Sequence, residues 1–224
     1  GLAQAPLTFD VASIKLNKSG STRSSTSMPP VGRFEAVNVT LRELVVQAFQ
    51  LRPFQVVGGP GWLDGDHFDV LARTPDGAPP DRMPEMLRAL LTERFQLEVH
   101  TEMREQPVYA LVAARSDGRL GPGLRRADCS GDTCGMETST SNGSGSVKGV
   151  GRTMSDLTGW LSRIVDRAVM DHTGMPGTYD FELRFTRDEV VSRGTAQPSD
   201  PPSLFTALQE QLGLKLEGAR GPVE

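Results

Sequence analysis

Alternating apolar and polar positions predict that much of the chain forms short β-strands. Residues 8–16 (TFDVASIKL) alternate in this way, as a half-buried strand does. The same alternation, or a short apolar run between turn residues, predicts further strands at residues 34–39, 54–57, 67–73, 95–100, 108–114, 147–150, 168–170, 178–185 and 214–217. We therefore expect a protein with a large share of β-structure.

Between these strands, apolar residues recur every three to four positions and predict amphipathic helices. Thr40 begins the first helix as its N-cap, and Glu43 three residues later completes a capping box. Thr153 and Ser203 are N-cap residues of the same kind. The predicted helices cover residues 41–49, 84–94, 154–164 and 204–212. Helices and strands together place the chain in the α+β class.

The order of these elements is repeated once along the chain. The matched segments, first copy before second, are 40–44 and 153–157, 61–62 and 174–175, 68–70 and 179–181, 97–99 and 214–216, and 107–108 and 222–223. The offset between the copies starts at 113 residues and is 115 at Pro107 and Pro222. Because chance matches rarely stay in order across several elements, we predict an internal duplication that gives two similar β-α-β-β-α-β units.

The predicted domain organisation follows from the duplication. Residues 1–33 hold an N-terminal strand and a Ser/Pro-rich loop, 34–115 form the first repeat unit, 116–146 are a Gly/Ser-rich linker with both cysteines, and 147–224 form the second repeat unit. Within this sequence, which stops at Glu224, the second unit is predicted to lack a counterpart of the strand at residues 108–114. We therefore expect an open sheet edge there, where unpaired backbone groups can accept a strand from another chain.

Composition and charge narrow the class of partner. The formal net charge is -4, with 37% hydrophobic and 23% charged residues, which is ordinary for a globular protein. Nucleic acid requires a basic surface, so we expect no nucleic-acid partner. No apolar run approaches the roughly 20 residues that cross a bilayer, so we expect no membrane-spanning segment. A protein or a cell-envelope component is the partner that these observations favour.

Two features of the sequence indicate a location outside the cytoplasm. Residues 3–5 (AQA) have the small-x-small pattern of a signal-peptide cleavage site, which an Ala-rich terminus would also show. Cys129 and Cys134 are the only cysteines, and we favour a short-loop disulfide because a zinc site would need two further ligands nearby. We therefore predict a periplasmic or secreted protein, its signal peptide largely removed, with no bound metal or cofactor.

Candidate chemistry gathers in the polar segment 62–69. Asp64, Asp66 and His67 lie in this segment, and together with His100 they could perform acid–base hydrolysis if they were enclosed. A calcium loop would need more oxygen ligands and a distal glutamate, so we interpret the segment as a turn. Trp62 follows Gly-Pro-Gly and is either an exposed binding platform or a plug in the core; we favour the core.

Several motifs resemble a family of soil-bacterial proteins that is abundant in Acidobacteria and is named for a domain of unknown function, DUF3738. The motifs lie at residues 9–15 (FDVASIK), 39–41 (VTL), 58–62 (GGPGW), 108–112 (VYALV), 174–181 (GMPGTYDF) and 203–210 (SLFTALQE). Members of this family are typically exported, but the resemblance implies no activity and no catalytic residues. The repeat unit also resembles the short N-terminal modules of secretins and TonB-dependent transporters, which bind other proteins; this is an analogy of fold alone.

Two functional hypotheses follow from the sequence. The first is a non-catalytic extracytoplasmic binding or sensory module that engages a protein or envelope component by strand addition. The alternative is a secreted hydrolase that uses acidic residues and a histidine between the two units. Convergence of those residues in one deep pocket would favour the hydrolase, and scattered, solvated positions would favour the binding module.

Overall fold

The computed structural model describes residues 7–27, 32–76, 78–115, 117–127, 134–141, 143–186 and 201–224. These residues form two compact units, and the boundary between them lies between Glu102 and Met103. Both units contain helices and antiparallel sheet, which confirms the α+β class. Within the described ranges, no helix is both long enough and apolar enough to cross a bilayer.

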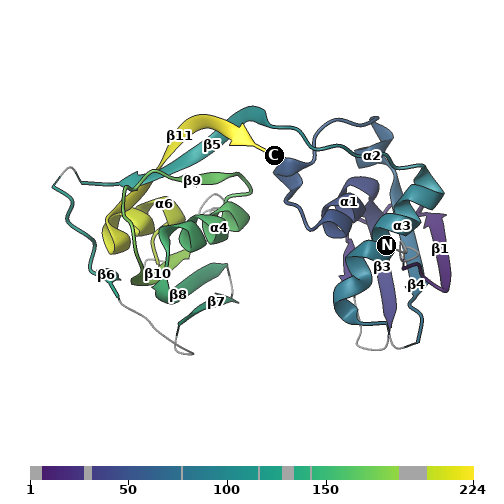
Figure 1. Ribbon diagram of the computed structural model, residues 1–224, viewed down its shortest axis with the longest axis horizontal. Helices are drawn as coiled ribbons and strands as arrows, with labels where there is room; N and C mark the ends of the chain where they lie inside the picture. Colours follow the sequence, from purple (N-terminus) through teal and green to yellow (C-terminus); the bar gives the residue numbers. More distant parts are fainter. Residues whose placement is uncertain are drawn as a thin grey trace, which may run out of the picture. The chain divides into compact units, whose positions relative to one another are not determined.

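The first unit is one antiparallel sheet with helices on one face (Figure 1). Its elements are β1 (Val11–Leu16), β2 (Ser25–Ser27), β3 (Arg33–Thr40), α1 (Leu41–Phe49), η1 (Pro53–Gln55), α2 (Trp62–Gly65), β4 (His67–Arg73), η2 (Pro80–Arg82) and α3 (Met83–Phe95). The strand order is β1-β4-β3-β2. Phe34 and Ala36 of β3 are fully buried and pack in one cluster with Leu44 of α1 and Leu91 of α3.

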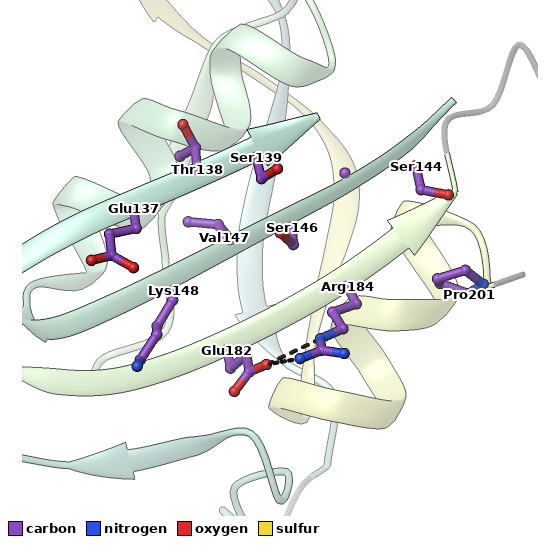
Figure 2. Close-up of a pocket in the computed structure, with 11 residues that line it drawn as sticks. Glu137, Thr138, Ser139, Ser144, Ser146, Val147, Lys148, Glu182, Arg184 and Pro201 are labelled. Atoms are coloured by element: carbon purple, nitrogen blue, oxygen red, sulfur yellow. Dashed lines mark hydrogen bonds and ion pairs between the residues drawn. The ribbon is translucent and has the colours of Figure 1, made fainter. Parts of the chain in front are cut away.

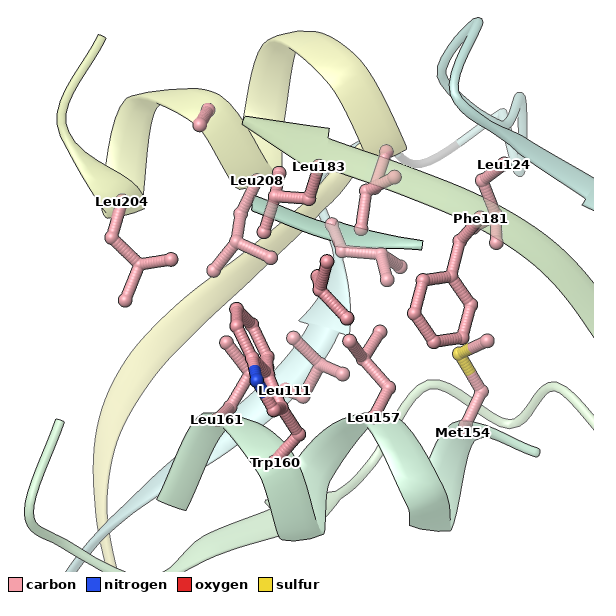
Figure 3. Packing of buried hydrophobic residues seen from close by; sticks show 14 of the residues in the cluster. Leu111, Leu124, Met154, Leu157, Trp160, Leu161, Phe181, Leu183, Leu204 and Leu208 are labelled. Atoms are coloured by element: carbon pink, nitrogen blue, oxygen red, sulfur yellow. The ribbon is translucent and has the colours of Figure 1, made fainter. Parts of the chain in front are cut away.

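The second unit places helices between two sheets (Figure 1). Its elements are β5 (Arg104–Ala113), β6 (Leu124–Arg126), β7 (Gly135–Ser141), β8 (Ser144–Arg152), α4 (Met154–Ile164), β9 (Val169–Asp171), β10 (Tyr179–Thr186), α6 (Leu204–Ala207), η3 (Leu208–Leu212) and β11 (Leu214–Val223). One sheet has the order β6-β10-β8-β7, and the other has the order β11-β5-β9. Figure 3 shows the core between them, where Leu157 and Leu161 of α4 lie close to Leu183 of β10 and Leu111 of β5.

The four-stranded sheets of the two units have the same strand order, since β1-β4-β3-β2 matches β6-β10-β8-β7 position by position. Each sheet also has the same irregularity just before its first long helix. Asn38 and Gly151 adopt left-handed backbone conformations there, with φ of 57° and 61°. The backbone N–H of each donates to an aspartate on the neighbouring strand, Asp69 in one unit and Asp180 in the other, both at 2.9 Å.

The helix starts form as the sequence predicts. Thr40 accepts a hydrogen bond from the backbone N–H of Glu43, whose carboxylate accepts the N–H of Thr40 in return. Thr153 and Asp156 form the same reciprocal pair at the start of α4. Ser203 caps α6. These contacts are local, so the sequence alone is enough to predict them.

Two predicted strands of the first unit do not form. Residues 54–57 were expected to be extended, but Pro53 begins the 3-10 turn η1, and proline suits a first helical position because its missing N–H is not needed there. Residues 95–100 were expected to form the next strand, but Phe95 still belongs to α3 and Gln96 ends that helix with a left-handed φ of 52°. The alternating residues that follow have no strand partner among the described residues, and Val99 is exposed.

The predicted linker at residues 116–146 contains strands in its described part. Strand β6 forms there, and β7 forms a tight hairpin with β8 that closes at Ser141 and Ser144. Gly143 in the turn has a φ of 81°, which glycine adopts without strain. The Ser/Thr/Gly composition typical of a flexible linker therefore also encodes a polar hairpin at the edge of a sheet.

The strand predicted at residues 108–114 belongs to the second unit, not to the first. It is part of β5, which pairs with β11 along its whole length, from Leu214 opposite Ala113 to Val223 opposite Arg104. The unit boundary therefore follows Glu102 and does not follow residue 115. Strand β11 extends well past the predicted range 214–217, because its partner lies about a hundred residues earlier in the chain and local patterns do not reveal it.

Candidate functional site

Strand β7 is one of the two edge strands of its sheet. It pairs with β8 on one side, and no strand in the described part of the chain pairs with its other side. Two residues separate Ser141 from Ser144, so this closing pair is hydrogen-bonded and every second residue before it is too. The backbone N–H and C=O groups of Met136, Thr138 and Thr140 therefore face the free side.

The side chains of the same three residues line a cavity of about 520 Å³ between β7 and helix α4. Met136, Thr138 and Thr140 form its strand wall, and Gly159 and Trp160 belong to its helix wall. A strand with free backbone groups thus lies directly beside a groove that can take side chains. This combination is the arrangement by which proteins bind extended peptides.

One end of the groove is aromatic. The ring of Trp160 packs edge-on against Phe185 with centroids 5.8 Å apart, and both residues line the groove together with Ile164. Gly145 pairs with both Phe185 and Thr140, so this aromatic end lies toward the Thr140 end of β7. An apolar side chain placed there would leave water for an apolar surface.

The other end of the groove is charged. Arg152 ends β8 and therefore lies toward the Met136 end of β7. Its Nη2 donates to Oδ1 of Asp156 at 3.1 Å, while its Nε is buried and bonds no described group. Burial raises the pKa of Asp156, but hydrogen bonds from the backbone and hydroxyl of Thr153 and the charge of Arg152 outweigh it, so the pKa is lowered overall. The carboxylate of Asp156 is therefore ionised at neutral pH.

Gly159 leaves the helix wall of the groove without a side chain at this position. It lies inside α4, where glycine is less favourable than alanine by about 0.5–1 kcal/mol. A Cβ at this position would meet no heavy atom within 4 Å, so packing does not require glycine here. The missing side chain instead leaves open space in the groove.

The opposite face of β7 is polar. It borders a second cavity of about 500 Å³, shown in Figure 2, where side chains of β7, β8 and β10 project from the sheet. Glu137, Lys148 and Glu182 form one row across the three strands. In the next row, Arg184 is paired with Glu182 at 2.8 Å. A strand added to β7 would thus have an amphipathic groove on one face and a charged surface on the other.

The chain matches the family described as "Protein of unknown function (DUF3738)" over residues 42–224. This range covers most of the sequence, from α1 onward. The chain belongs to the DUF3738 family. No curated protein and no solved structure matches it. The family description names no activity, so the function of this DUF3738 protein has to be argued from its geometry.

The aspartate that the sequence singled out first, Asp64, has a structural role. Its Oδ1 and Oδ2 accept hydrogen bonds from Nε and Nη2 of Arg42 at 2.5 and 2.9 Å. Arg42 also donates to the carbonyl oxygens of Val56 and Gly58, so it ties the following loop to helix α1. The hydrogen bond from Arg42 lowers the pKa of Asp64. The carboxylate is therefore held ionised by a neighbour that also fixes the loop.

The other candidates for acid–base chemistry do not share a cavity with Asp64. Asp66 follows α2, and His67 begins β4 with Nδ1 lying 3.3 Å from the carbonyl oxygen of Gly65. His100 is exposed in the segment after α3. None of the four lines either cavity beside β7 or the smaller one beside α1. The described residues contain no group of three or more His, Cys, Asp or Glu arranged to hold a metal ion.

Trp62 is not the core residue that the sequence favoured. Its side chain is 43% exposed, and one face of the ring stacks on Phe95 with centroids 6.3 Å apart.

The structure describes only one of the two cysteines predicted to form a disulfide. Cys134 precedes β7, and Cys129 lies outside the described residues. The disulfide between them stays a prediction.

The residues of the groove were not predicted from the sequence as a binding site. Two signals were available: the alternation of Met136, Thr138 and Thr140 in a segment classed as a linker, and a glycine at position 159 inside a strongly amphipathic helix. Each signal is weak alone, because threonine-rich loops and helix glycines are both common. Only the hairpin places them on opposite walls of one groove.

Proposed function

We propose that this DUF3738 protein is a non-catalytic binding or sensory module that acts outside the cytoplasm. It engages an extended segment of another protein or of a cell-envelope component by strand addition. The observation that carries the proposal is the free side of β7 with a groove directly beside it. In this mode of recognition, backbone hydrogen bonds supply affinity and alternate side chains in the groove supply specificity.

The geometry sets the length of the bound segment. Strand β7 has seven residues, so a fully paired partner strand spans about 23 Å. Its residues alternate between the groove on the α4 side and the polar face of the sheet. Peptides of about seven residues should therefore bind nearly as well as longer segments that contain them.

Strand β11 also has one free side among the described residues, but it is the weaker candidate. Pro222 lacks a backbone N–H, and Gly218 and Gly221 bring no side chains that would hold a partner strand. Charged side chains such as Lys215 are typical of edges that resist pairing. Strand β7 has neither proline nor lysine, and unlike β11 it borders two of the described cavities.

Other observations support the rest of the proposal. The equal strand order of the two sheets, with Asn38 and Gly151 in the same conformation, supports an internal duplication. The likeness of the unit to secretin and TonB-type N-terminal modules, which bind proteins, points the same way as an analogy of fold. The cleavage-like residues 3–5 and the cysteine pair support a location outside the cytoplasm.

A proline at position 138 tests strand addition directly. The N–H of Thr138 faces the free side, so Thr138→Pro removes a donor for the partner strand without removing a bond to β8. Thr138→Ala is the matched control, because it keeps the N–H. Peptides are first selected on the wild-type protein from a library of random ten-residue sequences displayed on phage, and their affinities are then measured by calorimetry.

We expect Thr138→Ala to bind within about threefold of wild type and Thr138→Pro to bind at least about tenfold more weakly. Circular dichroism and the unfolding midpoint establish that both variants are folded. Should Thr138→Pro unfold, Gly159→Leu serves instead, because its side chain fills the groove and leaves β7 intact. Equal affinity of a folded Thr138→Pro variant, or a library that yields no binding peptide, would contradict the proposal.

A further inference from the structure

We infer that the segment bound beside β7 carries an acidic side chain and an apolar side chain two or four residues apart, both facing helix α4. This inference rests on the proposed strand addition and states what the groove selects. It follows from the different chemistry of the two ends of the groove and from the period of a β-strand.

The acidic residue is required by the charge of the groove. Arg152 and Arg163 both line it, against the single carboxylate of Asp156. Arg152 uses one nitrogen on Asp156 and has a buried Nε that bonds no described group. Arg163 is exposed, and no ion pair joins it to the described residues. A carboxylate is the partner that a guanidinium with free donors recognises best.

The apolar residue is required by the aromatic end. Trp160 is only 8% exposed, and the part that remains accessible borders the groove beside Ile164. Gly159 opens the helix wall at the adjoining position. A leucine- or phenylalanine-sized side chain fits there, and a charged one would be desolvated without a partner.

The spacing follows from the strand. In an extended segment, side chains on one face recur every second residue. Arg152 lies toward Met136 and Phe185 toward Thr140, and these two β7 residues are separated by two full repeats of that period. The acidic and apolar residues are therefore two or four positions apart in the partner. An odd spacing would place one of them on the polar face beside Glu137 and Glu182.

The test uses the peptides selected on phage, displayed with fixed residues at both ends so that no random residue is a free terminus. We expect the selected sequences to share Asp or Glu with an aliphatic or aromatic residue at even spacing. A synthetic peptide and its Glu-to-Gln twin are then titrated into wild type, Arg152→Met and a control variant, Arg125→Met. Arg125 is exposed, pairs with Asp180 and lines neither cavity beside β7.

We expect the Glu-to-Gln change to weaken binding at least about fivefold in wild type and in Arg125→Met, and less than about twofold in Arg152→Met. If Arg152→Met does not fold, Arg163→Met takes its place. The Glu-to-Gln difference in wild type should also narrow as salt rises from about 0.05 to 0.5 M.

Three results would overturn the inference. They are selected peptides without an acidic preference, a Glu-to-Gln effect that persists in Arg152→Met, and an affinity that follows a free C-terminal carboxylate when acid and amide forms of the peptide are compared. In each case, peptides that still bind the Thr138→Pro variant more weakly than wild type would leave the proposed function intact. Loss of that proline effect, by contrast, would refute strand addition itself.

Discussion

Gly159 offers a sharp test of the groove, because a single methyl group reports whether the space beside α4 is open. Replacing it by alanine adds a Cβ that meets no heavy atom within 4 Å. The steric cost is therefore absent, and the helix gains the difference in propensity, about 0.5–1 kcal/mol. We expect Gly159→Ala to raise the free energy of unfolding of the second unit by this amount.

Gly145→Ala is the matched control, with the opposite expected sign. A Cβ at Gly145 would fall on the ring of Phe185, within 3.0 Å of its Cε2. The ring is fully buried, so the substitution should destabilise the unit by about 1–3 kcal/mol. The two substitutions thus contrast open space in a helix at Gly159 with a buried ring beside a strand at Gly145.

Urea denaturation followed by tryptophan fluorescence measures both effects. Trp160 adjoins residue 159 and reports on the second unit, and a Trp62→Phe background removes the signal of the first unit. If Gly159→Ala destabilised the protein, some group would occupy the groove in the folded state. The space beside β7 would then not be free for a ligand, and the reasoning behind the proposed function would be refuted.

Further predictions concern the core, the response to acid and the cysteine pair. Leu161 is fully buried in α4, so Leu161→Ala should lower the free energy of unfolding by about 2–5 kcal/mol in urea denaturation; a loss below about 1 kcal/mol would contradict this packing. A backbone N–H of β8 and then Arg125 lower the pKa of Asp180, so its carboxylate stabilises the fold above its unfolded pKa of about 3.9. That stability is lost as pH falls through the lower folded value, and urea midpoints of Asp180→Asn should depend less on pH than those of wild type. A disulfide between Cys129 and Cys134 predicts a gain of about 2 Da in intact mass on reduction, and an unchanged mass would refute it.

The parts of the fold that depend on neighbouring residues could be predicted from the sequence. The capping boxes at Thr40 and Thr153 form between residues three apart, and the apolar faces of α1 and α4 follow from helical spacing. Strand β4 alternates cleanly because one of its faces is buried and the other is not. In these cases the local sequence pattern favours the same secondary structure that the tertiary packing requires.

The predictions from sequence were wrong where contacts between distant segments decide whether a segment forms a strand. Residues 97–99 and 108–112 carry similar apolar patterns, yet only the second segment finds a partner strand, in distant β11. Strand β7 has no buried apolar face because both of its faces border cavities, so its pattern resembles that of a linker. Residue composition alone therefore does not distinguish this edge strand from a flexible linker.

The candidate site was missed for a related reason. The sequence drew attention to a cluster of charges around Asp64, but that carboxylate binds Arg42 and fixes a loop. The charged residues of the groove beside β7 do not form such a cluster, because they come from the end of a hairpin and from a helix that are unremarkable separately. A binding site built from backbone edges and open space leaves a faint trace in sequence, because its key feature is an absence of side chains.

Hydrogen–deuterium exchange of the protein with and without a phage-selected peptide tests the central claim most directly. Strand addition predicts that the amides of Met136, Thr138 and Thr140, which face the free side of β7, exchange more slowly when the peptide is bound. Amides of β11 should exchange at the same rate in both states. Protection of β11, or a bound peptide that leaves β7 unprotected, would contradict the account.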